Sequence, residues 1–225
     1  MRMKVQDTNG TRARGAELTR QQILDAALRL FAARGYAGAS TKAIIETGNV
    51  TKPAMYYHFG SKAGLFRAIV DQNENRLLEV ISQIKGEVQS TPERLVEICA
   101  AMFQFACDRP EDMSLAVDLL LQARKLRPPQ NHCFGKAQKR LAVIQEVMEQ
   151  GKIDGLLSKQ IDSRQLAVGF LGMIHLHILF HLANPRSPLT RRTAENAVGL
   201  FLQGAASAKS KHFTFPTQAT KGTAK

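Results

Sequence analysis

A short stretch of the chain collects small, polar and basic side chains of the types that proteins use to contact nucleic acid. Thr51, Lys52 and Ala54 are small or polar enough to approach the edges of bases. Tyr56 and His58 follow within two turns, and their side chains can donate hydrogen bonds to phosphate oxygens. Their spacing predicts one polar surface along a single short helix.

Two further positions favour phosphate binding because each lies at the start of a predicted helix. Lys62 begins one helix and Thr41–Lys42 begins another. The N–H groups and the positive end of the dipole at a helix N-terminus attract anions. A purely structural alternative is a three-helix packing unit, in which Met55 and Phe59, spaced i and i+4, belong to the core.

Three helices must position these side chains. Ile23, Ala26, Ala27, Leu30 and Phe31 recur at helical spacing and predict a helix from Arg20 to Arg34, with Thr19 as its cap and Gly35 as its end. A second helix begins at Ser40 or Thr41 and ends at Gly48–Asn49, and a third follows from Lys52 to His58. Two short helices joined by a four-residue turn, Gly48–Thr51, have the spacing of a helix-turn-helix.

At these residues the chain resembles the DNA-binding domain of the tetracycline-repressor (TetR/AcrR) family. The resemblance rests on the segments 20–35, 40–41, 50–59, 61–62 and 65–66, which lie within a span of about 47 of the 225 residues. It implies a homodimeric transcription regulator, usually a repressor, that a small ligand in the C-terminal domain releases from its operator. The C-terminal part resembles the family only in being helical, with a Glu149–Gly155 segment before a long apolar helix.

The resemblance also implies which residues contact DNA. By position these are Thr41, Lys42, Thr51, Lys52, Pro53, Ala54, Tyr56, Tyr57, His58 and Lys62. Three residues depart from the family's common pattern at the end of the second helix and in the turn: Ile45 and Gly48 stand where Ala is common, and Asn49 stands where Gly is common. The departures concern the angle of the third helix.

The positive charge is concentrated at the two ends of the chain. The formal net charge is +12. Residues 1–62 hold ten Lys and Arg against four Asp and Glu, which gives +6, and residues 205–225 hold four Lys and no acid, which gives +4. The remainder is nearly balanced, so an anionic polymer is the expected partner of the N-terminal segment.

The rest of the pattern predicts an all-α chain of two domains. We expect a disordered basic arm at 1–17, a helix-turn-helix domain at 18–65, a helical ligand-binding and dimerisation domain at 66–208, and a disordered basic tail at 209–225. A fourth helix of about 24 residues, Lys62 to Gly86, is long enough to link both domains. Only helices are predicted after Gly86.

The larger domain offers candidate ligand contacts and few signs of other chemistry. The predicted pocket residues are Met102, Phe103, Met113, Met148, Phe170, Met173 and His177, although Met and Phe at helical spacing also suit an ordinary core. His177 and His181 have a metal-ligand spacing, but no third ligand is evident, so no metal and no cofactor are predicted. Cys99, Cys107 and His132–Cys133 show no orienting motif for a nucleophile.

The expected environment is the cytoplasm. The N-terminus has no apolar stretch typical of a secretory signal, and three cysteines do not suit a disulfide framework. The apolar run Leu166–Leu182 is interrupted by His175, His177 and His181, and its length is at the short limit for a membrane span. A buried helix and a protein without a membrane partner are predicted.

These observations favour a ligand-responsive transcriptional regulator that binds a palindromic double-stranded DNA operator as a homodimer. The expected effector is a small apolar or amphipathic molecule, and an enzymatic activity is not expected. Two alternatives stay open: a helical enzyme with an incidental helix-turn-helix, and an architectural DNA-binding protein without a ligand. Against the enzyme stands the absence of a carboxylate pair, a Gly-rich phosphate loop or a nucleophile triad.

Overall fold

Every regular element in the described part of the chain is an α-helix. The computed structural model describes residues 8–87, 90–121 and 131–203, and the all-α prediction is confirmed there. The helices are α1 (Thr8–Gly38), α2 (Thr41–Gly48), α3 (Lys52–Phe59), α4 (Lys62–Glu87), α5 (Thr91–Asp108), α6 (Pro110–Leu121), α7 (Asn131–Ile153), α8 (Ser163–Ala183) and α9 (Arg191–Gln203). The predicted tail at 209–225 lies outside the described residues.

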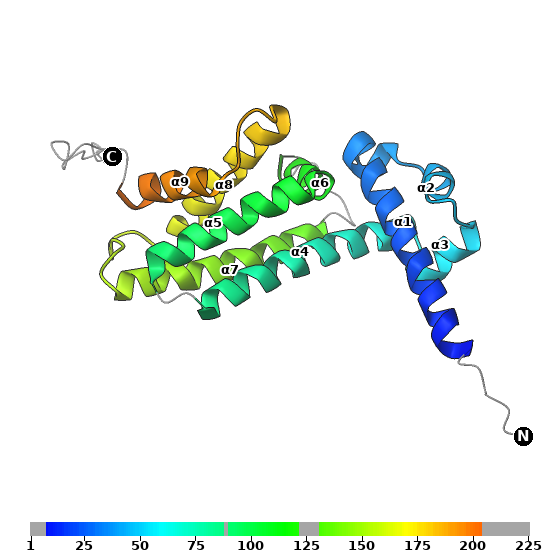
Figure 1. The fold of residues 1–225 in the computed structure, drawn as a ribbon, viewed down its shortest axis with the longest axis horizontal. Coiled ribbons are helices and arrows are strands. Elements are labelled where there is room, and N and C mark those ends of the chain that lie inside the picture. The colour runs from blue at the N-terminus through cyan, green and yellow to red at the C-terminus, as the bar shows by residue number, and fades with distance from the viewer. Residues whose placement is uncertain (1–7, 88–89, 122–130, 204–225) are drawn as a thin grey trace, which may run out of the picture.

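The first helix begins earlier than the sequence pattern predicts. It starts at Thr8, within the arm expected to be disordered, and its first turns extend away from the other helices (Figure 1). Thr19 does not cap it, because its hydroxyl donates to the Gly15 carbonyl at 3.0 Å inside the helix. Gly35, with φ of 67°, interrupts the helical backbone at the predicted end, although one more turn follows to Gly38.

Two hydrophobic clusters organise the molecule. The N-terminal cluster, built on Ile23, Phe31, Ile44, Met55 and Phe66, fills the space between α1, α2, α3 and the start of α4. It extends past the predicted boundary at residue 65 and includes Ile69, Val70 and, from α6, Leu115. The C-terminal cluster fills the bundle formed by α4, α5, α7, α8 and α9.

The fourth helix belongs to both clusters. Figure 1 shows α4 running from the small helices at one end into the bundle, where it lies beside α7. Leu65 and Phe66 are buried in the N-terminal cluster, and Leu77 and Ile81 in the C-terminal one. The α4 helix therefore connects the bundle directly to the small helices.

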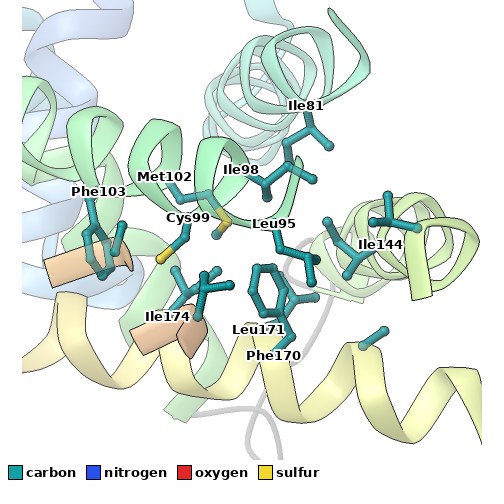
Figure 2. Close-up of a cluster of buried hydrophobic side chains, with 14 of the residues drawn as sticks. Ile81, Leu95, Ile98, Cys99, Met102, Phe103, Ile144, Phe170, Leu171 and Ile174 are labelled. Atoms are coloured by element: carbon teal, nitrogen blue, oxygen red, sulfur yellow. The ribbon is translucent and has the colours of Figure 1, made fainter. Parts of the chain in front are cut away.

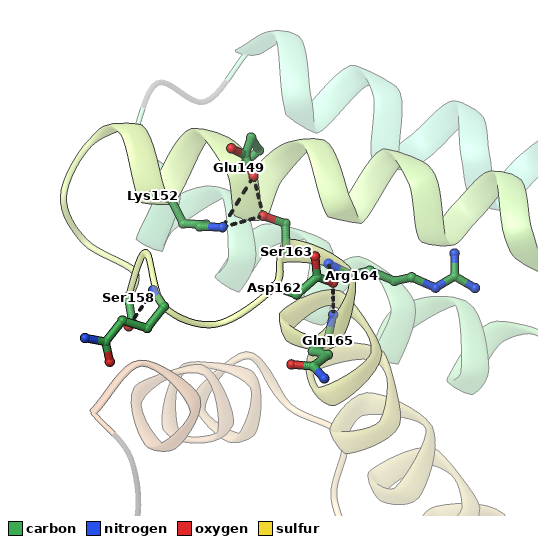
Figure 3. A network of polar contacts seen from close by, with 8 residues as sticks. Glu149, Lys152, Ser158, Asp162, Ser163, Arg164 and Gln165 are labelled. Atoms are coloured by element: carbon green, nitrogen blue, oxygen red, sulfur yellow. Dashed lines mark hydrogen bonds and ion pairs between the residues drawn. The ribbon is translucent and has the colours of Figure 1, made fainter.

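Polar contacts fix the turn between α7 and α8, which brings the two helices together. Asp162 caps α8 by accepting hydrogen bonds from the backbone N–H groups of Arg164 at 2.9 Å and Gln165 at 3.2 Å (Figure 3). The half-buried Lys152 ammonium donates to the Ser163 hydroxyl at 3.1 Å, and that hydroxyl donates to Glu149. This network anchors the N-terminus of α8 to the last turns of α7.

Candidate DNA-binding surface and apolar core

The turn between α2 and α3 is built by local backbone geometry. Ser40 caps α2 by accepting from the Ala43 N–H at 3.1 Å, and Thr51 caps α3 by accepting from the Ala54 N–H at 3.3 Å. Asn49 has φ of 48° and ψ of 46°, a left-handed conformation that Asn tolerates better than most residues. The departure from Gly at this position therefore leaves the turn intact.

The start of α4 fixes the other end of α3. Ser61 caps α4 by accepting from the Gly64 N–H at 3.0 Å. A Cβ added at Gly64 would overlap the carbonyl oxygen of Phe59, the last residue of α3. Only glycine lets the two helices approach so closely, which ties the orientation of α3 to α4. No local pattern in the sequence marks Gly64, because its role depends on a contact between two helices.

The two faces of α3 differ in polarity, as the helix-turn-helix prediction requires. Met55 is fully buried in the N-terminal cluster and Phe59 packs against it. The opposite face is exposed and carries most of the predicted DNA contacts: Thr51, Lys52, Pro53, Tyr56 and Tyr57. Tyr57 is 84% exposed, unusually high for an aromatic side chain, so it is available to a partner. Ala54 and His58 are half-buried at the margin of this face.

The three lysines of the predicted surface have different surroundings. Lys42 is exposed at the start of α2, with its ammonium 3.9 Å from Glu46. The Lys52 ammonium lies 6.0 Å from the centre of the Tyr56 ring. Lys62 is half-buried with its ammonium 4.5 Å from the Tyr36 ring, and burial lowers the pKa of this lysine. Lys42 and Lys52 are thus the freer cations for a phosphate backbone.

The predicted pocket residues gather in one place in the bundle. Met102, Phe103, Met113, Met148 and Phe170 are all buried members of the C-terminal cluster, and Met173 packs against it. Figure 2 shows Met102, Phe103 and Phe170 converging from α5 and α8 with Ile174 and Leu171. The seven residues share one apolar environment, and their assignment to a ligand stays a prediction.

The histidines of α8 are held by hydrogen bonds within the protein. The His177 ring lies 5.8 Å from the Phe103 ring, and its Nδ1 hydrogen-bonds the Met173 carbonyl at 2.9 Å. His181 Nδ1 hydrogen-bonds the Ser187 carbonyl at 2.7 Å. Among the described residues, no group of three His, Cys, Asp or Glu side chains could hold a metal ion.

Polar pairs join helices that are distant in the sequence, and the sequence alone did not predict them. Asn73 on α4 donates to the buried Asp112 of α6 at 2.6 Å. Glu74, the next residue, accepts a hydrogen bond of 2.7 Å from Arg140 on α7. These partners are 39 and 66 residues apart along the chain, and no local pattern marks them.

The α8 helix is long and apolar enough to cross a membrane by length and composition, with a mean hydropathy of 1.8. It nevertheless packs against α5, α6 and α7 and contributes Ala167, Phe170, Leu171, Ile174 and Ile178 to the C-terminal cluster. The helix predicted to be buried is present but only partly buried, because one face packs in the bundle and only 28% of its most apolar window is buried. Its other face remains exposed at Val168, Leu176 and Phe180.

Comparison with known proteins places the helix-turn-helix in a family. Residues 23–69 match the model of the family described as bacterial regulatory proteins, tetR family. The HTH-type transcriptional repressor NicS of Pseudomonas putida is 27% identical over 155 residues, which are 68% of this chain and 72% of NicS. The repressor AcnR of Corynebacterium glutamicum is 32% identical over 106 residues, which are 47% of this chain and about half, 51%, of AcnR.

Similarity in fold extends beyond this domain. The crystal structure of AibR in complex with isovaleryl coenzyme A and operator DNA aligns with a TM-score of 0.66 and 23% identity, over 81% of this chain and 97% of that one. The alignment includes helices of the bundle as well as the helix-turn-helix, since it covers most of both chains. The N-terminal helices, residues 23–69, thus form a domain of the tetR family of bacterial regulatory proteins, and the chain as a whole shares the fold of this solved structure.

Proposed function

We propose that the protein is a ligand-responsive transcriptional regulator, a repressor that leaves its operator when a small effector binds in the helical bundle. The observation that carries the proposal is the exposed polar face of α3, which is held at a fixed angle by Asn49 on one side and Gly64 on the other. NicS and AcnR, which are similar in sequence to part of this chain, are repressors.

The proposed DNA contacts divide into two kinds. Thr51, Lys52 and Tyr56 face outward along α3 and reach base edges in the major groove, and Pro53, Ala54 and Tyr57 line the same helix. Thr41 and Lys42 at the start of α2, with His58 and Lys62, contact phosphates. Because phosphate contacts release counterions, this second group sets the salt dependence of binding.

The proposed assembly is a homodimer formed through α8 and α9. Large apolar side chains are exposed on these two helices: Val168, Leu176, Phe180 and Leu200. A second copy covers such a surface symmetrically and forms a four-helix bundle. We expect Leu176→Glu to shift the protein toward monomer in sedimentation velocity at micromolar concentration, whereas Glu79→Gln on the exposed side of α4 leaves it dimeric. A monomeric wild-type protein would contradict the assembly.

The proposed effector is an apolar or amphipathic molecule that inserts beside Met102, Phe103, Met113, Met148, Phe170, Met173 and His177. Because α4 belongs to both clusters, a ligand that spreads the bundle changes the distance between the two α3 helices of the dimer. The ligand acts only if it binds the two arrangements with different affinity. AibR, which shares the fold, was crystallised with an acyl coenzyme A and operator DNA.

The proposed setting is the cytoplasm, without a membrane partner and without an enzymatic activity. The described residues named above are proposed to bind DNA or the effector or to connect the two sites, and none is assigned to a reaction. The similarity to the regulators NicS and AcnR supports this assignment to regulation.

The experiment that tests the proposal is selection of bound duplexes from a random DNA library by the full-length protein. We expect enrichment of a palindrome whose half-sites are about one helical turn apart, roughly 34–36 Å between recognition helices. A variant with Tyr56→Ala and Lys52→Ala should lose this enrichment. If the wild-type protein enriches no sequence over a random pool, the proposed function is wrong.

A further inference from the structure

A buried ion pair at one end of the apolar cluster leaves hydrogen-bonding capacity unused. Arg140 on α7 donates from Nη1 to Glu74 Oε1 on α4 at 2.7 Å, and the two side chains are only 11% and 14% exposed. Arg140 Nε and Glu74 Oε2 are fully buried atoms without a hydrogen-bond partner. Buried polar atoms nearly always have a hydrogen-bond partner. The unused donor on Arg140 and the unused acceptor on Glu74 therefore suit a bound molecule that supplies both hydrogen bonds.

The pair faces the interior of the bundle. Glu74 lies three residues before Leu77, and Arg140 lies four residues before Ile144, and both of these neighbours are buried in the C-terminal cluster. Residues three or four apart share one side of a helix. The open atoms therefore lie on the same side of their helices as the apolar cluster that contains the predicted pocket residues.

A third helix places a histidine within the electrostatic reach of Arg140. His175 on α8 hydrogen-bonds the Leu171 carbonyl, and burial together with the charge of Arg140 lowers its pKa to about 4. The imidazole is therefore neutral near pH 7 and adds no positive charge to the site. Arg140 and Glu74 cancel each other, so the whole group of three side chains carries no net charge.

We propose that Glu74 and Arg140 bind the head group of the effector, and that this head group is a neutral hydroxyl or carboxamide. The inference rests on the proposed function and specifies its ligand. A hydroxyl or amide accepts a hydrogen bond from Arg140 Nε and donates one to Glu74 Oε2, which satisfies both open atoms. A carboxylate accepts from Arg140 but cannot donate, and it meets the charge of Glu74. The apolar part of the effector then extends along the C-terminal cluster.

The experiment compares molecules that differ only in their head group. Thermal-shift and calorimetric titrations at pH 8 use full-length protein with 1-octanol, octanamide, octanenitrile and octanoate, and with benzyl alcohol, benzamide, benzonitrile and benzoate. In at least one series we expect the alcohol and the amide to bind at least tenfold more tightly than the carboxylate. The nitrile, which accepts but does not donate, should fall between them. Tighter binding of the carboxylate, or no binding in either series up to millimolar concentration, overturns the proposal and leaves water as the occupant.

Two variants assign the preference to the ion pair. Glu74→Gln should reduce the advantage of the alcohol over the nitrile at least fivefold, whereas Glu79→Gln on the exposed side of α4 should leave it unchanged. Arg140→Lys keeps the positive charge and removes Nε, so every accepting head group should bind more weakly; it decides the matter if Glu74→Gln does not fold. Unchanged head-group preference in the folded variants contradicts the assignment.

Operator binding, followed in the same samples, separates the two proposals. If the wild-type protein shows the head-group preference but binds no operator, the proposed regulator is contradicted and the proposed ligand site is supported. If compounds release the operator equally well from the wild type and from both variants, the regulator is supported and the proposed ligand site is contradicted.

Discussion

The polar contacts within the helix-turn-helix end and those between helices of the bundle join residues at very different separations along the chain. Around α2 and α3 the decisive hydrogen bonds join residues three apart: Ser40 with Ala43, Thr51 with Ala54, and Ser61 with Gly64. In the bundle they join residues 39, 63 and 66 apart, as in Asn73–Asp112, Thr91–Asp154 and Glu74–Arg140.

This difference matches the two tasks that we propose. A surface that reads DNA must keep its shape, and local caps hold each short helix independently of the rest. A bundle that changes shape when a ligand binds must have two arrangements of similar free energy. The few polar pairs between distant helices can break when contacts with the ligand replace them. The predictions below test whether the two regions differ in this way.

The largest effect is expected for a core substitution at the DNA-binding end. Phe31 is fully buried, and its ring lies 5.4 Å from that of Phe66 in an edge-to-face arrangement. Phe31→Ala should lower the free energy of unfolding by about 3–5 kcal/mol. Operator binding should weaken as well, because it depends on the folded domain. Urea denaturation would measure the loss of stability, and a binding titration would measure the loss of affinity.

The exposed Tyr57 supplies the matched control for Phe31. Tyr57→Ala should change the free energy of unfolding by no more than about 0.5 kcal/mol, yet weaken operator binding, because its ring is 84% exposed and packs within the protein only against the neighbouring His58 ring, 5.2 Å away. Equal destabilisation by both substitutions would show that Tyr57 belongs to the fold and not to the binding surface.

Glycine substitutions should have opposite signs in the two regions. Gly64→Ala forces the start of α4 away from the Phe59 carbonyl, with a loss of roughly 1–3 kcal/mol and weaker operator binding. Gly135 on α7 has open space around it, so Gly135→Ala should raise stability by up to about 1 kcal/mol. Thermal unfolding of both variants checks the signs, and a neutral Gly64→Ala would contradict the close contact.

Acidification should weaken the bundle through His175. Its pKa is lowered to about 4 by burial, so between about pH 4 and 6.5 the unfolded chain binds a proton that the native state does not. Stability therefore rises with pH across this window and is fully restored above it. Relative to pH 7, the loss at pH 5 should be about 2 kcal/mol, measured by urea denaturation.

His175→Gln separates this effect from other titrations. The variant cannot protonate at this position, so its stability should depend less on pH between 5 and 7 than that of the wild type. Identical pH profiles for the two proteins would mean that His175 is already accessible to protons in the native state.

The range of the contacts also explains what the sequence can predict. The caps at Ser40, Thr51 and Ser61 and the turn at Asn49 are encoded within three or four residues, so their positions could be predicted. The early start of α1 could not, because the prediction took Thr19 as a cap, whereas the structure pairs its hydroxyl with the Gly15 carbonyl inside a continuous helix.

In the bundle, the periodicity identified Met102, Phe103 and Phe170 as inward-facing, and they do lie in one cluster. The pairing of Glu74 with Arg140 depends on which helices become neighbours, and no residue near either one encodes that choice. The same limit applies to Gly64, whose role is defined by the approach of α4 to the end of α3.

The central claim, that α2 and α3 form an operator-binding surface, is tested most directly by the salt dependence of DNA affinity. Fluorescence anisotropy would give the Kd of the selected palindrome between 50 and 200 mM salt for wild type, Lys42→Ala, Lys52→Ala and Lys139→Ala. Lys42→Ala should weaken binding and reduce the slope of log K against log salt by about 0.9 for the lost phosphate contact. Lys52→Ala, which removes a base contact, should weaken binding to the palindrome with a smaller change of slope. Lys139, exposed on α7 in the bundle, should give the wild-type slope. Unchanged affinity and slope for Lys42→Ala and Lys52→Ala would contradict the claim.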